Sequence, residues 1–160
     1  MTPFRKGIFF LLITVFIITL DQVSKYFALT SLSPFYPTEG FHLFGIHLNF
    51  LLIYNKGAAW GMLAKYPIFL ISLRFFLLAF LCYYIFFITH KKWVFFALCG
   101  VFAAALSNII DVCIKGAVVD MIHVSYKGAS FPVFNIADMV ICLSVITLLV
   151  GERILQKKGT

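Results

Sequence analysis

The fold is decided by residues 94–113, which read VFFALCGVFAAALSNIIDVC. A helix needs about 20 mostly apolar residues to cross the hydrocarbon of a membrane, and this run supplies them. At about 100° per residue, Gly100, Ala104, Asn108 and Asp111 share one face. Small side chains let membrane helices approach closely, and an asparagine can join them by hydrogen bonds. The stretch therefore predicts a membrane helix whose packed face carries a carboxylate near one end.

Three further segments have the same apolar character, at about 7–29, 67–89 and 134–151. Hydrophobic residues make up 62% of the chain and charged residues 12%, against about 45–50% and 25% in soluble domains. The composition excludes an ordinary soluble domain. We predict an all-α integral membrane protein, with a single domain over residues 1–160 and four transmembrane helices.

The formal net charge of +7 is typical of nucleic-acid binding proteins until the basic residues are located. They stand before the first apolar run, between the second and third, and after the fourth, as Arg5, Lys6, Lys91, Lys92 and Arg153. Basic residues at cytoplasmic helix ends orient membrane proteins. We therefore predict no nucleic-acid partner, and we expect both termini and the link between the second and third helices to lie in the cytoplasm.

The two remaining connections are then expected on the outer face. The first, residues 30–66, is long and rich in proline, glycine and aromatic residues. Within it, residues 45–54 have a strand-like composition and precede the turn-prone Asn55-Lys56-Gly57. We predict a small sheet here, lying on the membrane surface. The second connection, residues 114–133, carries turn signals at Lys115-Gly116 and Lys127-Gly128.

Four of the six acidic residues lie in or beside the outer ends of the expected helices, namely Asp21, Asp111, Asp120 and Asp138. A carboxylate within hydrocarbon costs about 3 kcal/mol, so such acids mark functional sites. Two acids in a low dielectric coexist only with a cation or a shared proton. With a shared proton, one carboxylate takes a proton from water while its partner donates to the substrate carbonyl. Asp120 and Asp138 are our candidates for this aspartic-peptidase arrangement.

Five short blocks stand in order along the chain: DQVSK at 21–25, NKGAAW at 55–60, NIID at 108–111, VVDMI at 118–122 and FNIAD at 134–138. Together they resemble the lipoprotein signal peptidase (signal peptidase II) family over essentially the whole length. The resemblance implies a four-helix fold with a periplasmic β-cradle, in the bacterial cytoplasmic (inner) membrane, with the active site near the outer face. It also implies an aspartic endopeptidase that removes signal peptides from diacylglyceryl-modified prolipoproteins. The cut falls on the amino side of the lipid-modified cysteine.

The resemblance also assigns roles to residues. The catalytic pair falls on Asp120 and Asp138, and Asn55 and Gly57 match positions of the substrate-binding site. The other candidates for that site and its polar shell are Asn108, Asp111 and Asn135. The expected partners are lipid-modified prolipoproteins and membrane lipid, and the expected inhibitor is the cyclic peptide globomycin. Neither a metal nor an organic cofactor is implied.

The third block departs from the family, which usually has Gly-Asn-x-x-Asp-Arg. Here Ser107 precedes Asn108, and Val112 follows Asp111. The missing arginine leaves Asp111 without an adjacent cation. One hypothesis is that Arg74, well inside the second expected span, reaches Asp111 by extending its side chain. The alternative is that Arg74 extends to a lipid phosphate and that Asp111 bonds only to Asn108.

Other chemistries fit the sequence less well. The four cysteines lie within apolar runs without metal-ligand spacing, so we expect small buried hydrophobes. The histidines lack the H-E-x-x-H pattern of a zinc peptidase. Ser24 and Lys25 are adjacent, without the helical spacing of a Ser–Lys dyad. We expect Lys25 to pair with Asp21 or to extend to the interface.

Two non-peptidase classes also fit the sequence less well. A transporter typically has charged residues near the bilayer midplane and internal repeats. Here the acids are expected towards the outer leaflet, and the sequence contains no internal repeat. An assembly protein would explain the small-residue face but not two facing acids. In the outer loop, Trp60 packs on lipid or acyl chain in one hypothesis and is an ordinary interfacial residue in the other.

Overall fold

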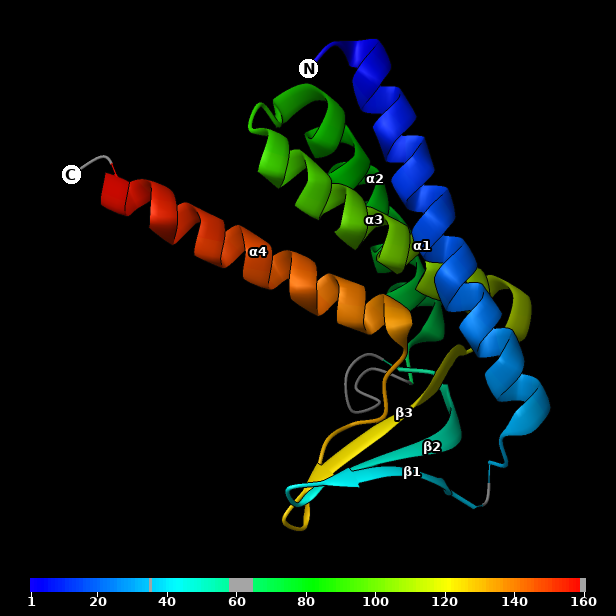
Figure 1. Ribbon diagram of the computed structural model, residues 1–160. Helices are drawn as coiled ribbons and strands as arrows, with labels where there is room; N and C mark the ends of the chain where they lie inside the picture. The colour runs from blue at the N-terminus through cyan, green and yellow to red at the C-terminus, as the bar shows by residue number, and fades with distance from the viewer. Residues whose placement is uncertain (35, 58–64, 159–160) are drawn as a thin grey trace.

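The computed structural model describes residues 1–34, 36–57 and 65–158, with residues 155–158 as backbone alone (Figure 1). The two hypotheses for Trp60 lie outside the described residues. Within the described part, helices occupy all four segments predicted to be helical. The ends differ by at most four residues, except that α4 continues seven residues beyond the predicted end. In chain order the elements are α1 (Pro3–Ser31), β1 (Thr38–Leu43), β2 (Ile46–Asn55), α2 (Pro67–Tyr83), the π-helix η2 (Tyr84–Ile88), α3 (Lys92–Lys115), β3 (Val118–Tyr126), β4 (Ala129–Ser130) and α4 (Ile136–Lys158).

Helix α3 contacts each of the other three α-helices. In Figure 1, α1, α2 and α3 run side by side, while α4 diverges from α1. The small-residue face of α3 is packed as predicted, because Ala104 is fully buried and Gly100 lies against α4. A Cβ atom added at Gly100 would stand 2.6 Å from the Ser144 hydroxyl oxygen. Glycine here allows the close approach of α3 and α4.

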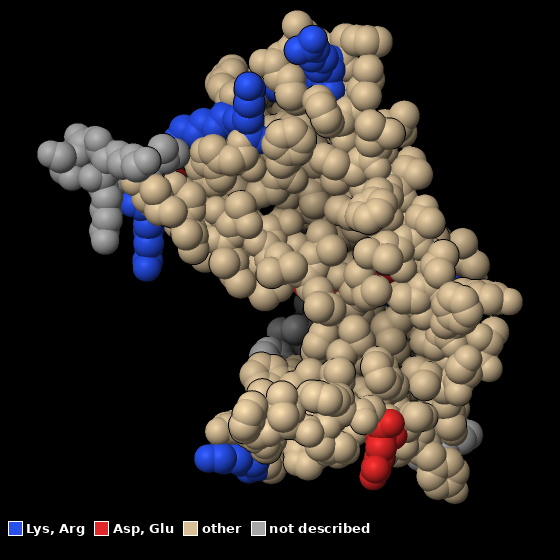
Figure 2. Space-filling model, viewed as in Figure 1, with Lys and Arg blue, Asp and Glu red and all other residues tan. Residues whose placement is uncertain are grey.

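The helices expose large apolar side chains, as a membrane protein does to lipid. Within the described residues, three helical segments are long and apolar enough to cross a membrane: α1, Pro67–Ile88 and α3. The four-span count therefore remains a prediction for α4. In Figure 2, the visible surface between the basic helix ends and the sheet carries almost no charge. Cys113 and Cys142, which we expected to be buried, are exposed on the helix surfaces.

A lysine holds the first two helices together at the end farthest from the sheet. The Lys6 ammonium donates to the carbonyl oxygens of Thr89 at 2.7 Å and Phe86 at 3.4 Å. The last carbonyls of a helix lack intrahelical donors, and a cation there also complements the helix dipole. Lys6 therefore satisfies the end of η2 while anchoring α1 beside it.

The sheet is antiparallel, with the strand order β1-β2-β3-β4. Strands β1 and β2 form within residues 30–66, where a small sheet was predicted, but β3 and β4 come from the second connection, for which no strand was predicted. Strand β2 pairs with β3 from Ile46↔Tyr126 to Asn55↔Val118. This pairing joins residues far apart in the sequence, so local composition could not show it. Its consequence is that β3, which carries Asp120, lies inside the sheet.

Two connections fix β3 relative to the helices. Gly116 ends α3 in the left-handed conformation (φ 72°), and its N–H donates to the Val112 carbonyl. Such a C-cap suits glycine because it lacks a Cβ. Beyond β4, the chain runs back along β3 and forms a β-bridge between Phe134 and Ile122. This bridge places the start of α4 beside Asp120.

Replacing Gly100 by leucine should lower the melting temperature in detergent, because the added side chain enters the packed contact with Ser144. Overpacking of this kind costs about 1–3 kcal/mol. The matched control is Gly7→Leu on α1, where an added Cβ meets no atom within 4 Å. Equal melting temperatures for the two variants would contradict the close contact of α3 and α4.

Candidate active site

A cavity of about 530 Å³ opens between helices α2, α3 and α4 and the sheet. Figure 2 shows the surface hollowed between the helices and the sheet. Its wall is mostly apolar, and its polar part comprises Asn55, Gly57, Arg74, Asn108, Asp120 and Asp138. The structure thus brings both predicted catalytic carboxylates, with three of the predicted substrate residues, to one cavity. Among the described residues, no group of three His, Cys, Asp or Glu side chains could hold a metal ion.

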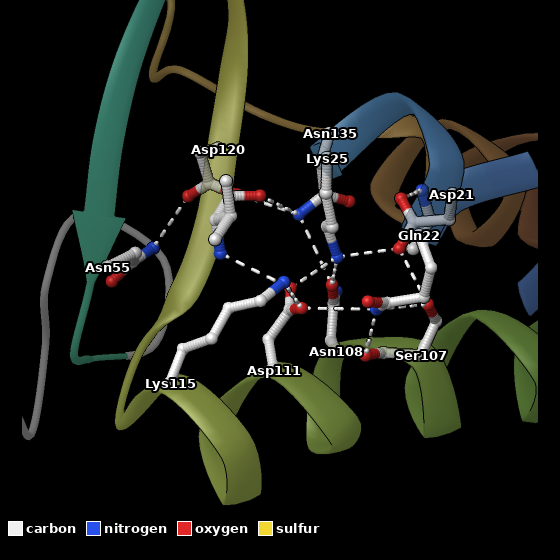
Figure 3. Close-up of polar contacts among 12 residues, drawn as sticks. Asp21, Gln22, Lys25, Asn55, Ser107, Asn108, Asp111, Lys115, Asp120 and Asn135 are labelled. Carbon is white, nitrogen blue, oxygen red and sulfur yellow. Dashed lines mark hydrogen bonds and ion pairs between the residues drawn. The ribbon is translucent and has the colours of Figure 1, made fainter. Parts of the chain in front are cut away.

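Asp120 enters this cavity from β3 and is 97% shielded from solvent, with 3% of its surface exposed. The Asn135 side-chain amide donates to one carboxylate oxygen at 2.7 Å, and Asn55 donates to the other at 3.2 Å (Figure 3). Burial, and then the negative charge of Asp138, raise the pKa of Asp120 from 3.8 to about 6. The bonds from the two asparagines and the charge of Lys25 oppose this rise.

Asp138 lies in the first turn of α4 and is fixed by the helix start. Its backbone N–H donates to the Asn135 side-chain oxygen at 2.9 Å, and its carboxylate accepts from the Asn135 N–H at 3.2 Å. This reciprocal pair has the form of a capping box, which satisfies N–H groups at a helix start. Asn108 donates to the other carboxylate oxygen at 3.1 Å. The capping explains the orientation of Asp138 and leaves its carboxylate facing the cavity.

Asn135 connects the two carboxylates. Its fully buried amide nitrogen donates to Asp120 at 2.7 Å, to the Asn108 side-chain oxygen at 3.2 Å and to the Val119 carbonyl at 3.3 Å. Its backbone N–H donates to Asp138. Asn135 therefore sets both carboxylates from behind the cavity wall and does not line it.

A second group of charges lies behind the cavity, around Lys25 of α1. The Lys25 side chain is 0% exposed, and its ammonium nitrogen lies 2.6 Å from a carboxylate oxygen of Asp21 and 2.6 Å from one of Asp111 (Figure 3). It also donates to the Asn108 side-chain oxygen at 2.8 Å. The predicted pairing of Lys25 with Asp21 is confirmed. The Ser24 hydroxyl instead donates to the backbone carbonyl of Asp21.

Asp21 also joins α1 to α3 and α4. It accepts from the Ser107 hydroxyl at 2.6 Å and from the Ala137 N–H at 2.9 Å. Gln22, the next residue on α1, donates to the Ser107 hydroxyl at 3.1 Å and to Asp111 at 3.1 Å. Ser107, one of the two departures from the family pattern, is thus part of the contact between helices.

Both hypotheses for Asp111 were wrong. Its carboxylate pairs with Lys25 and also with Lys115, whose ammonium lies 2.7 Å away. Lys115 stands four residues later on the same helix, and this spacing brings side chains together. The sequence therefore held the signal, but we interpreted Lys115 only as part of a turn. Asp111 is fully buried and does not line the cavity, so the geometry favours a supporting role.

Arg74 does not bond to Asp111, but to the backbone just after β2. Its guanidinium donates to the Gly57 carbonyl at 2.8 Å. The Gly57 N–H donates to the Asn55 side-chain oxygen at 3.0 Å, a local bond that closes an Asx turn. The same Asn55 amide donates to Asp120. One edge of the site is thus formed by Arg74, Gly57 and Asn55. The sequence predicted Asn55 and Gly57 here, but not the bond from Arg74.

Comparisons with known proteins agree with the resemblance drawn from the five blocks. The family described as signal peptidase (SPase) II matches residues 13–153. A lipoprotein signal peptidase of Staphylococcus aureus (strain bovine RF122 / ET3-1) is 36% identical over 144 residues, covering 88% of this chain and 85% of the relative. The lipoprotein signal peptidase of strain JH9 is 35% identical over the same shares.

Two solved structures have a similar fold. Both are described as bacterial membrane enzymes determined by the in meso method, one at 2.3 Å and one at 1.9 Å resolution. The first has a TM-score of 0.79 and 32% sequence identity, and covers 94% of this chain and 89% of its own. The second has a TM-score of 0.75 at 32% identity, with 89% and 90% covered. The chain belongs to the signal peptidase II family.

Proposed function

We propose that this member of the signal peptidase II family cleaves prolipoproteins with the paired carboxylates of Asp120 and Asp138. The family activity is removal of signal peptides from prolipoproteins by an aspartic peptidase. The observation that carries the assignment to this pair is their common placement on one cavity, each held by asparagine amides. No cation bonds directly to either carboxylate among the described residues, so they can share a proton.

The proton distribution follows from the surroundings. Burial and the charge of Asp138 raise the pKa of Asp120 to about 6, and we therefore assign the shared proton to Asp120. It donates this proton to the carbonyl oxygen of the scissile peptide bond. Asp138 accepts a proton from the attacking water, and the new C–O bond forms as the carbonyl becomes tetrahedral. Asp138 then passes the water proton to the peptide nitrogen, and the C–N bond breaks. The tetrahedral carbon becomes the carboxyl group of the released signal peptide as its hydroxyl proton returns to Asp120, and the lipid-modified cysteine leaves with a free amine.

The cavity wall suits an apolar substrate. Beside the carboxylates it is lined by leucine, valine, alanine and isoleucine from α2, α3 and α4. A diacylglyceryl-modified prolipoprotein carries its lipid on the cysteine side chain and its apolar signal peptide on the amino side of that cysteine. For cleavage on the amino side of that cysteine, the carbonyl of the preceding residue has to lie beside Asp120 and Asp138, which line this cavity. Asn55, Gly57 and Asn108 are the proposed contacts with substrate, with Asp111 and Asn135 supporting them. Globomycin would occupy the same cavity.

We place the protein in the bacterial cytoplasmic membrane as a single domain with four spans, of which α4 is the fourth. The basic residues at the ends of the helices support cytoplasmic termini. The sheet then forms a cradle on the outer face, and the cavity lies at the level of the outer leaflet. A membrane-embedded substrate could reach this cavity laterally, between the diverging helices and the sheet.

Asp120→Asn and Asp138→Asn should each lower turnover by about a thousandfold or more, because the two carboxylates act as a unit. The amide keeps the shape of the side chain, so globomycin binding should largely survive. The measurement is cleavage of a lipid-modified prolipoprotein by purified protein. Glu39→Gln on the exposed strand β1 is the matched control and should leave turnover unchanged. Wild-type turnover in a folded variant of either aspartate would reject the pair.

The raised pKa of Asp120 predicts a pH dependence of stability. The folded protein holds the Asp120 proton up to about pH 6, whereas the unfolded chain releases it near 3.8. Protonation therefore stabilises the fold fully below 3.8, and the contribution is lost as pH rises through about 6. The melting temperature should fall over this range in the wild type, and Asp120→Asn should remove part of the fall. Parallel curves for the two proteins would contradict the raised pKa.

The orientation predicts which cysteines an impermeant thiol reagent reaches. In a variant lacking the native cysteines, a cysteine at Lys127 should react in intact spheroplasts, because the turn after β3 lies outside. A cysteine at Lys91, before α3, should react only after the membrane is opened. Labelling at position 91 together with protection at 127 would show that the proposed orientation is reversed.

A further inference from the structure

The Lys25 ammonium is a buried cation that the proposed reaction does not use directly. It is fully enclosed, and it does not line the cavity. Burial of an ionised group is costly unless charges and hydrogen bonds compensate. Here Asp21 and Asp111 each approach within 2.6 Å, and the Asn108 oxygen accepts the third bond at 2.8 Å. The first two contacts explain how the charge is neutralised. The third contact connects Lys25 with the catalytic pair, because Asn108 also bonds to Asp138.

The bond to Asn108 determines which end of that amide faces Asp138. An amide side chain can present either its oxygen or its nitrogen, and only the nitrogen donates. The Asn108 oxygen accepts from Lys25 at 2.8 Å and from Asn135 at 3.2 Å. Its nitrogen is therefore left to donate to Asp138 at 3.1 Å. Without Lys25, one of the two donors that select this orientation is lost.

The charge of Lys25 also reaches the pair. Four carboxylates from four elements surround this part of the molecule: Asp21 of α1, Asp111 of α3, Asp120 of β3 and Asp138 of α4. The cations facing them are Lys25, Lys115 at the end of α3, and Arg74 across the cavity on α2. Lys115 is 22% exposed, so water screens it more than the enclosed Lys25.

Resting on the proposed function, we infer that Lys25 is a positioning residue for the reaction. It orients Asn108 toward Asp138, and its charge sets the pH range in which the catalytic pair holds one proton. In the free protein, the charge of Lys25 opposes the rise in the pKa of Asp120, which is consistent with this second effect. Lys25 touches neither the cavity nor the reacting atoms, so its effect passes through Asn108 and through the electric field.

The test compares Lys25→Met with Lys115→Met. Both variants remove a cation from Asp111, but only the first removes the donor to Asn108. In Lys25→Met, kcat should fall about a hundredfold, as expected for misplacement of a catalytic group. KM should change little, because Lys25 does not line the cavity. Lys115→Met should keep kcat within a few fold of wild type.

The pH profile separates positioning from stability. A pair that works with one shared proton has a bell-shaped dependence of rate on pH. Loss of a nearby positive charge makes each carboxylate hold its proton more tightly, so both limbs of this profile should move to higher pH. At an effective dielectric of about 20, removal of a unit charge about 10 Å from a carboxylate shifts the limbs by roughly one pH unit. Lys115→Met should shift them less. Unchanged kcat, or a profile like that of Lys115→Met, would overturn the inference.

Lys25→Met leaves Asp21 without its cation and could prevent folding. The second variant is therefore Asp21→Asn with Lys25→Met, which removes one buried anion and one buried cation together. Asp111 keeps Lys115 in this variant. Its kcat should still fall, because Asn108 lacks its donor, and its pH shift should be smaller than that of the single variant. Loss of folding in both variants would assign Lys25 to the fold alone and overturn the inference.

The same measurements distinguish this inference from the proposed function. If Asp120→Asn is inactive while Lys25→Met behaves as wild type, only the role of Lys25 fails. If Asp120→Asn retains turnover, the catalytic pair itself fails, whatever Lys25→Met does. Lys25→Arg provides a conservative comparison, because it keeps the charge. It should retain the wild-type pH limbs even where its longer side chain lowers kcat.

Discussion

A carboxylate shielded from water needs either a cation or a proton. This constraint sorts the acids of the site, three of them buried and Asp138 half-buried, into two kinds. Asp21 and Asp111 bond directly to lysine ammonium groups. Asp120 and Asp138 accept hydrogen bonds from asparagine side chains and from a backbone N–H. An ammonium partner holds an acid in its ionised form, whereas an amide partner tolerates either form. Chemistry that moves a proton requires the second kind.

The architecture serves this division. Helix α3 is the common neighbour of the other α-helices and carries Asn108 and Asp111 one turn apart. Asp111 faces the lysines, while Asn108 lies between Lys25 and Asp138. The β-bridge at Phe134 brings the start of α4 alongside β3, so acids separated by a strand and a turn meet at one cavity. The helix packing and the β-bridge thus hold the carboxylates of Asp120 and Asp138 at one cavity, although their charges repel each other.

The sequence predicted the helices well because their length and apolar face are local properties, as in 94–113. Of the site residues predicted from the five blocks, all but Asp111 and Asn135 line the cavity. The second half of the sheet was missed because pairing of β2 with β3 is not local. The Lys115 partner of Asp111 was available from its spacing of four residues. The bond from Arg74 to Gly57 was not, because it depends on where the end of β2 lies relative to α2.

The two departures from the family pattern, Ser107 and Val112, lie among the buried charges around Lys25. In both cases a nearby acid still has a bonding partner. Val112 removes the cation expected beside Asp111, but Lys115, one helical turn after Asp111, supplies a positive charge to the same carboxylate. Ser107 replaces a glycine with a hydroxyl, and that hydroxyl donates to Asp21. Each substitution changes the residue that contacts an acid without leaving the acid unpaired. What the site requires of its surroundings is therefore a balance of buried charge, which more than one arrangement of residues can provide.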